Sequence, residues 1–379
     1  MRKLIAHSVC DRQGTFHGLK VAVEATLKRG AQSLFILGCA RNDISAAQWN
    51  NYLETLDTTV FGGLFPRIIY DTDCLEQGIV VCGFSEALPV ATIALNQAPP
   101  SQWRHTLESD TPWLKQCKSL VVLIDSQSSL IDPFIELLYD QVGASLPIAG
   151  GGAGDIDASA QPCILTNQGL LSDCALLIGL PTPLALGVTH GWRHLAGPFL
   201  VTESRGNTLY SLNYEPAAKL YKTIIEQHTG HHFCDQDIMT LAKAYPFGIE
   251  RLDNEILIRD PVAEDKGALT CMGTIPEHAM IHIMQGDRDS LLAAADRAVL
   301  AVKGEAPEAP VSQPFLFDCI SRALFLGDDF PQEIDHVHRA LASRHPLVGA
   351  LTLGEIASSP WGPVQFLNKS IVVSALREH

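Results

Sequence analysis

Three segments of the chain repeat one order of hydrophobic and polar positions. Each opens with a short, continuous apolar run of the kind that forms a buried strand: Ser33–Cys39, Ser119–Asp125 and Pro314–Cys319. Apolar residues at helical spacing follow, over Ala46–Leu56, Ile131–Val142 and Gln332–Ser343. Each segment then has a strand that runs into glycines, a turn or ribbon, and a last apolar strand. The pattern predicts an α/β fold of mixed sheets in helix-covered layers, built from a repeated strand–helix–strand–strand unit.

The middle of the chain departs from this pattern. Residues 184–300 contain short alternating strands and end in a predicted helix over Ser290–Val302. The stretch 303–314 is rich in Pro, Glu and Ala and is the clearest linker in the chain. Another boundary falls near residues 181–183, where two prolines occur. We therefore expect two α/β domains, residues 15–182 and residues 183–379.

The composition is that of a globular protein with an acidic surface. The 379 residues are 46% hydrophobic and 18% charged, which suffices for a large core and excludes a disordered chain. The net charge of −15, without a dense Lys/Arg run, argues against nucleic acid and membrane as partners. The N-terminal apolar stretch is too short for a signal peptide, so we expect a cytoplasmic protein. Ten cysteines form no CxxC pair, and we expect most of them to be small buried hydrophobes.

Several motifs follow one another along the chain. They are SLVVLID, PIAGGGAGD, GVTHGWRHLAGPFLVTESRGNTLYSLNYEPA, IRDPV, CMGTIPEHAMIHIMQGD, FDCISR and PLVGALTLGEI. Their order and spacing resemble the FIST family of bacterial signal-transduction proteins, over about residues 15–375 and across its N-terminal and C-terminal domains. The resemblance implies a sensory role through a bound small ligand, without catalysis. Similar stand-alone members include haem proteins that sense nitric oxide and act on a histidine kinase or a cyclic-di-GMP enzyme.

Candidate ligand-binding residues follow two of the predicted strands. Cys319 ends one strand, Arg322 comes just after it, and Glu355 closes the strand and turn LTLGEI. Ligands of open α/β folds bind beyond the carboxyl ends of strands. There Arg322 can hold a carboxylate, Glu355 an amine, and Cys319 a soft metal. The alternative is a buried Arg–Glu pair beside a packed cysteine. The C-terminal domain of the family often has a His–Asn pair after this turn, of which the chain has Asn368, preceded by Leu367.

Two histidines offer metal ligands after another predicted strand. His190 and His194 flank the tripeptide Gly191–Trp192–Arg193. A neutral imidazole here can be the axial ligand of a haem b, with Trp192 as a wall of the pocket and Arg193 beside the ligand. Cys319 is a further candidate ligand, for iron or for an iron–sulfur cluster. The alternative is a set of ordinary polar residues at a domain junction.

Three functions remain open from the sequence. The first is a haem- or iron-containing sensor of nitric oxide that regulates a histidine kinase or a cyclic-di-GMP enzyme. The second is a metal-free receptor for an amino acid or small carboxylate, which uses Arg322 and Glu355. The third is an enzyme with Cys319 as its nucleophile, although PIAGGGAGD lacks the Lys-Ser/Thr of a phosphate loop and no nucleophile, base and orienting group stand out. A homodimer is compatible with each function.

Overall fold

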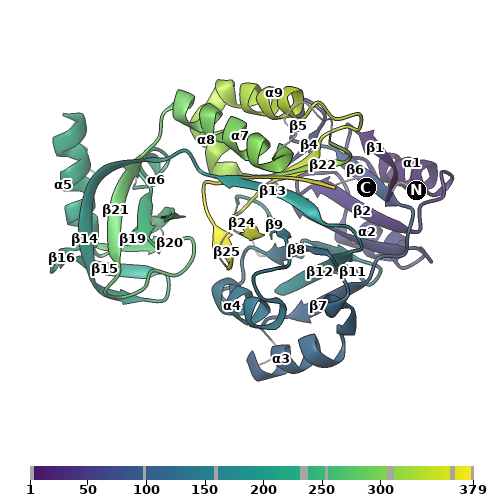
Figure 1. Cartoon of the computed structure of the whole chain (residues 1–379), viewed down its shortest axis with the longest axis horizontal. Coiled ribbons are helices and arrows are strands. Elements are labelled where there is room, and N and C mark those ends of the chain that lie inside the picture. Colours follow the sequence, from purple (N-terminus) through teal and green to yellow (C-terminus); the bar gives the residue numbers. More distant parts are fainter. Residues whose placement is uncertain are drawn as a thin grey trace.

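The protein consists of a body with three β-sheets and a smaller β lobe beside it (Figure 1). The computed structural model describes residues 4–96, 100–157, 161–230, 238–251, 255–304, 311–358 and 363–376. Within these residues, no helix combines the length and the apolar character that crossing a membrane requires.

The three sheets of the body have the same strand pattern. The first runs β1–β6–β2–β3–β10–β11, with bounds Ile5–Asp11, Ile79–Phe84, Ser33–Cys39, Thr59–Phe65, Ile164–Thr166 and Gly169–Leu171. The second runs β7–β12–β8–β9–β24–β25, with bounds Val90–Ala94, Cys174–Leu180, Ser119–Asp125, Ile148–Ala153, Glu355–Ser358 and Val364–Leu367. The third runs β13–β26–β22–β23–β4–β5, with bounds Leu184–Thr189, Ile371–Leu376, Pro314–Cys319, Val348–Thr352, Arg67–Tyr70 and Asp73–Leu75. In each sheet the third and fourth strands are parallel, and the other neighbours are antiparallel.

Each repeat contributes a hairpin to the sheet of another repeat. The hairpin β4–β5 follows β3 in the first repeat, but β4 pairs with β23 of the third. In the same way β10 of the second repeat pairs with β3 of the first, and β24 of the third pairs with β9 of the second. The exchange closes the three repeats into a ring, so each sheet is completed by a neighbour.

A glycine occupies the equivalent position on the fourth strand of each sheet. A Cβ atom at Gly62, Gly150 or Gly349 would lie 1.8, 1.8 or 2.0 Å from a carbonyl oxygen of the adjacent parallel strand. Such distances are far shorter than a van der Waals contact, so only glycine fits. Because these three glycines are equivalent, the residues of the three repeats can be aligned by counting from them.

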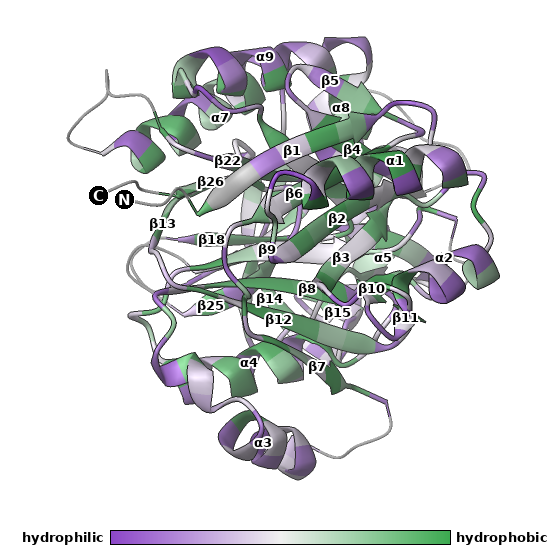
Figure 2. Ribbon diagram, turned by 90° about the vertical axis from the view of Figure 1, so that its right-hand side faces the viewer, coloured by the Kyte–Doolittle hydropathy of each residue, from purple (hydrophilic) through white to green (hydrophobic). Residues whose placement is uncertain are grey.

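The three sheets share one core, and helices cover their outer faces. In this core the ring of Phe35 lies 5.5 Å from Phe61 and 6.2 Å from Phe315, centroid to centroid, which joins the first and third repeats. Figure 2 shows the strands mostly hydrophobic and the helices two-sided. The covering helices are α1 (Phe16–Leu27) and α2 (Ala46–Leu53) on the first sheet, α3 (Pro100–Ser109), η1 (Pro112–Lys115) and α4 (Ile131–Val142) on the second, and α7 (Arg288–Lys303), α8 (Ile320–Leu326), η3 (Gly327–Asp329) and α9 (Phe330–Leu341) on the third.

The β lobe is an insertion in the third repeat, between β13 and α7. Its sheet runs β18–β17–β21–β14–β15–β20–β19, and β16 pairs with β15. A separate core that includes Tyr221 and Phe247 holds the lobe together. Its elements are β14 (Arg193–Arg205), β15 (Thr208–Leu212), β16 (Glu215–Pro216), α5 (Ala217–Thr229), α6 (Ile238–Ala242), β17 (Phe247–Glu250), β18 (Ile256–Arg259), β19 (Pro261–Asp265), β20 (Ala268–Cys271) and β21 (Met280–Gln285).

The α/β fold class with its three repeats, predicted from the sequence, is confirmed. The bounds predicted for β2, β8 and β22 are those of the structure. The motif PLVGALTLGEI, expected to form a strand and a turn, instead contains the strand β23 and the start of β24, which belong to different sheets. The domain division at 182/183 stays a prediction, and strands from both sides of it pair in the second and third sheets. Residues 305–310 of the expected linker lie outside the described residues.

Candidate functional site

A cavity of about 450 Å³ lies where the β lobe joins the body. The chain crosses between body and lobe twice, and both crossings reach the cavity. His190 lies in the first, after β13, and Ser290 lies in the first turn of helix α7, which follows the second. Figure 1 shows β13 leaving the body toward the lobe at this point. The lobe contributes Glu255 and Ile258, and the body contributes Ser370. The volume lies within the range of roughly 300–1,000 Å³ that small-molecule sites have.

His190 brings a hydrogen-bond donor to this cavity. Its Nδ1 accepts a hydrogen bond from the backbone N–H of Trp192 at 3.0 Å. Burial lowers the pKa of His190 to about 4, with the charges of Arg322 and Arg297 adding to the effect. The ring is therefore neutral at pH 7 and carries its proton on Nε2. An anion in the cavity can accept that proton in a hydrogen bond.

The same geometry does not fit His190 as a metal ligand. An axial histidine binds through an unprotonated nitrogen and donates a hydrogen bond through the other, whereas here Nδ1 accepts. His194 is exposed on β14, and its ring lies edge-on to that of His282 at 4.9 Å between centroids. Among the described residues, no three His, Cys, Asp or Glu side chains are grouped to hold a metal. The haem and iron–sulfur hypotheses stay predictions that this site does not favour.

Charges of both signs lie around the cavity. Arg297 on α7 is exposed and makes no ion pair with the residues that the structure describes. Arg193 forms an ion pair with Asp287, the N-cap of α7, and so links the two chain crossings. Among the described lining residues, Glu255 carries the negative charge. A ligand with both a carboxylate and an amine can therefore meet Arg297 and Glu255.

Trp192 is a fixed wall of the cavity. Its Nε1–H donates to the carbonyl of Lys369 at 3.0 Å, and its ring lies edge-on to Phe325 at 5.1 Å. The Lys369 ammonium lies 5.0 Å from the ring centroid on the buried side. A Cβ at Gly286 would lie 2.2 Å from the ring, so the second chain crossing also needs glycine here. Trp192 thus connects both crossings with the turn before β26.

A buried ion pair joins the lobe to the body behind this wall. The Nζ of Lys369 lies 3.1 Å from Oδ2 of Asp260, which also accepts a hydrogen bond from Ser321 at 2.9 Å. Burial raises the pKa of Asp260. The backbone N–H of Asp260 donates to Oδ1 of Asn368 at 3.4 Å. Asn368 is therefore a buried link between body and lobe, not a lining residue of the cavity.

Arg322 is fully buried, and all of its N–H groups are used. Its Nε and Nη2 hold the Glu333 carboxylate at 3.1 and 2.5 Å. Its remaining donors reach the carbonyls of His190 at 2.5 Å, Lys369 at 3.5 Å and Leu291 at 3.2 Å. Arg322 therefore has no free donor for the predicted contact with a ligand carboxylate. Arg322 instead positions the backbone that carries the cavity wall.

Two further carboxyl groups are buried beside this network. Burial, and then the charge of Glu333, raises the pKa of Asp318 well above its usual range. Burial raises the pKa of Glu355 to about 8, although Thr352 donates to it at 2.8 Å. The thiol of Cys319 lies beside Glu355, and burial raises the pKa of Cys319 as well. A nucleophilic cysteine needs a lowered pKa, so this position gives Cys319 no activation.

The other two repeats serve as an internal control for these buried acids. Asp318 aligns with Gly38 and Ile124, and Glu355 aligns with Ile68 and Ile164. The equivalent strands of the first two repeats therefore form without either carboxyl group. Because buried ionic groups contribute little net stability, their presence in the third repeat marks the end next to the lobe as specialised.

The structure brings some predicted residues together and separates others. Those that line the cavity are His190, Trp192 and Arg193, and those buried behind it are Cys319, Arg322, Glu355 and Asn368, whereas His194 lies outside both sets. The sequence analysis missed Arg297, Glu255 and Lys369. Arg297 has the spacing of a solvated helix residue, and Glu255 precedes a short strand, so neither stands in a motif.

Comparison with known families finds two matching domains. The FIST N domain matches residues 34–215, and the FIST C domain matches residues 217–358. The chain belongs to the FIST family. FIST domains are associated with small-ligand sensing in signal transduction. In this FIST protein the two matched segments meet inside the β lobe, between β16 and α5. No curated protein matches the chain in sequence.

Proposed function

We propose that this FIST protein is a metal-free receptor for a small amino acid or carboxylate, which binds in the cavity between body and lobe. The observation that carries the proposal is the neutral His190 donor in a cavity that Arg297 also lines. The ligand carboxylate accepts hydrogen bonds from Nε2–H of His190 and from the guanidinium of Arg297. The ligand amine meets Glu255, and Trp192 excludes water from one side.

The ligand signals because it contacts both the body and the lobe. Glu255 belongs to the lobe and Arg297 to the body, so a ligand held by both favours one orientation of the lobe. The lobe then acts on a signalling partner, which we propose to be the histidine kinase or cyclic-di-GMP enzyme that the resemblance implies. The protein itself performs no catalysis in this scheme.

Thermal unfolding with a panel of amino acids and small carboxylates tests the proposal. A ligand at 100 times its Kd stabilises the fold by about 2.7 kcal/mol. The unfolding entropy of 379 residues is about 0.8 kcal/mol/K, so Tm should rise by about 3 °C. Arg297→Gln should remove this shift. Arg339→Gln, an exposed arginine on the neighbouring helix α9, is the matched control and should retain it.

An absorption spectrum separates this proposal from the haem hypothesis. The protein is purified from cells supplied with iron and a haem precursor. A featureless spectrum together with an Arg297-dependent thermal shift supports the receptor. A stoichiometric Soret band that shifts with nitric oxide and disappears in His190→Ala would overturn it.

A further inference from the structure

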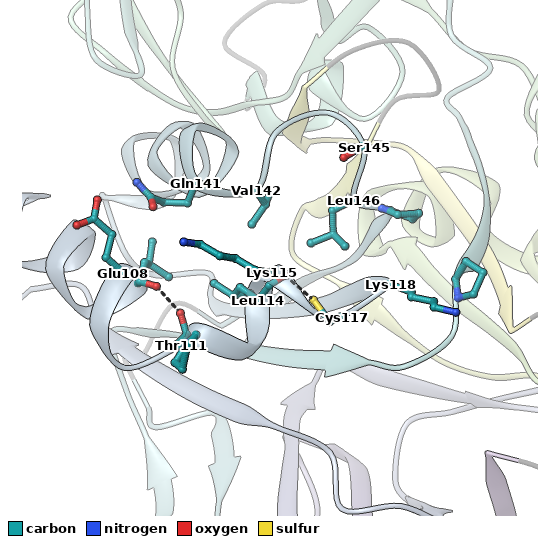
Figure 3. Close-up of a pocket in the computed structure, with 14 residues that line it drawn as sticks. Glu108, Thr111, Leu114, Lys115, Cys117, Lys118, Gln141, Val142, Ser145 and Leu146 are labelled. Atoms are coloured by element: carbon teal, nitrogen blue, oxygen red, sulfur yellow. Dashed lines mark hydrogen bonds between the residues drawn. The ribbon is translucent and has the colours of Figure 1, made fainter.

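A second cavity, of about 930 Å³, lies under the helices of the second sheet. It is placed at the amino ends of the parallel strands β8 and β9, between η1 and the end of α4 (Figure 3). Its described lining residues include none of those around the junction cavity. The two cavities are therefore separate, and the second has no part in the function proposed above.

Part of the wall of this cavity is apolar. Leu107, Leu114 and Leu146 line it and are each at most 9% exposed. Figure 3 shows Val142 of α4 on the side facing Leu114, across the cavity. The rim includes prolines at 112, 147 and 183, which limit backbone motion. An apolar group of a ligand can be buried here without rearrangement of the wall.

Two lysines add positive charge to this apolar space. Lys115 and Lys118 are exposed, and neither forms an ion pair with another described residue. In Figure 3 the Lys115 side chain extends across the cavity below Gln141, while Lys118 lies on the other side, below Leu146. Glu108 is the acid among the described lining residues. The balance of charge is therefore positive, over a wall of leucines.

We propose that this cavity binds an organic anion with an apolar body, such as a medium-chain or aromatic carboxylate. A bare inorganic anion would leave the leucine wall unfilled, and a neutral apolar molecule would leave both ammonium groups without a partner. A carboxylate on an apolar chain satisfies both, because lysine pairs as a point charge on a flexible stem. The amide of Gln141 and the hydroxyl of Ser145 provide hydrogen bonds for a second polar group.

Titration of the full chain with octanoate, and with octanol as the uncharged ligand of equal length, tests this proposal. We expect octanoate to bind about tenfold more tightly than octanol, measured by calorimetry. The double variant Lys115→Gln/Lys118→Gln should remove most of that preference. Lys219→Gln, an exposed lysine on the lobe, is the matched control and should leave it unchanged. Arg297→Gln should also leave octanoate binding unchanged, which separates this cavity from the junction cavity.

Three outcomes would overturn the proposal. The first is the absence of saturable octanoate binding. The second is an equal affinity in the double lysine variant. The third is unchanged octanoate binding in Val142→Trp, a variant that fills the cavity with an indole ring. Circular dichroism would verify that this variant folds.

Discussion

Two buried carboxyl groups compete for one guanidinium, and their replacement should have opposite effects. Glu333 makes the two-point contact with Arg322. Asp318 lies 3.3 Å from Nε of Arg322, but neither of its oxygens has a hydrogen-bond partner among the described residues. Burial and the charge of Glu333 raise the pKa of Asp318 well above its usual range, so the fold opposes the ionisation of this carboxyl. We predict that Glu333→Gln destabilises the protein and that Asp318→Asn stabilises it.

The magnitudes follow from the two roles. Removing one partner of a buried ion pair costs roughly 3–5 kcal/mol. In Glu333→Gln, Asp318 can ionise and replace part of the lost charge, so the lower end of that range is expected. With about 0.8 kcal/mol/K of unfolding entropy, Tm falls by about 4 °C. Asp318→Asn replaces a carboxyl whose ionisation the fold opposes with a neutral amide of the same shape, and it should stabilise the protein by about 1–3 kcal/mol at pH 7.

The pH dependence distinguishes the two carboxyl groups further. The pKa of Asp318 is raised in the fold, whereas the unfolded chain ionises near 3.8. Its contribution to stability is therefore complete below pH 3.8 and is lost as the pH rises. The advantage of Asp318→Asn should vanish near pH 4 and grow toward pH 7, measured by urea denaturation. Asp335→Asn, at a half-buried position of α9 that pairs with the exposed Arg339, is the control and should change stability by less than about 0.5 kcal/mol. A loss in Asp318→Asn equal to that in Glu333→Gln would refute the reasoning.

Three further changes test the surrounding structure. Burial raises the pKa of Glu355 to about 8, so Glu355 costs stability as the pH rises from 4.5 to 8. Glu355→Gln should remove this loss, which is up to about 1.4 kcal/mol per pH unit, and urea denaturation across that range checks it. Asp132→Asn should speed hydrogen exchange at Thr274, whose N–H and Oγ1 donate to Asp132 at 2.6 and 2.8 Å; unchanged exchange would show that this contact does not hold the lobe. Cys319 should alkylate more slowly than the half-buried Cys117, and faster reaction would favour the cysteine enzyme.

The individual strands could be predicted because their signals are local. Runs such as Ser33–Cys39 are continuously apolar and bounded by polar residues, glycine or proline. The hairpin exchange could not be predicted in this way. The strand β4 is short, and its partner β23 lies in the last repeat. Pairing over such a separation depends on the closure of the whole ring, which no local period of hydrophobic residues records.

The charged residues of the site were only partly predictable for a similar reason. A buried Arg–Glu pair was one of the two interpretations of Arg322 and Glu355, and such a pair exists, but its glutamate is Glu333. Glu333 lies on α9 among polar residues that read as a solvated face, although it is fully buried. The packing of α9 against α8 decides this burial, and sequence spacing alone does not.

The position of the lobe explains why buried charges occur in one repeat. The first two repeats pass from β1 to α1 and from β7 to α3 without an inserted domain, whereas the third inserts the lobe between β13 and α7. The lobe must hold a defined orientation, and a non-directional apolar contact alone would leave that orientation loosely specified. The pair Lys369–Asp260 and the contacts of Arg322 with the His190 and Lys369 carbonyls are directional and buried. The charges therefore fix the geometry of the cavity wall at some cost in stability.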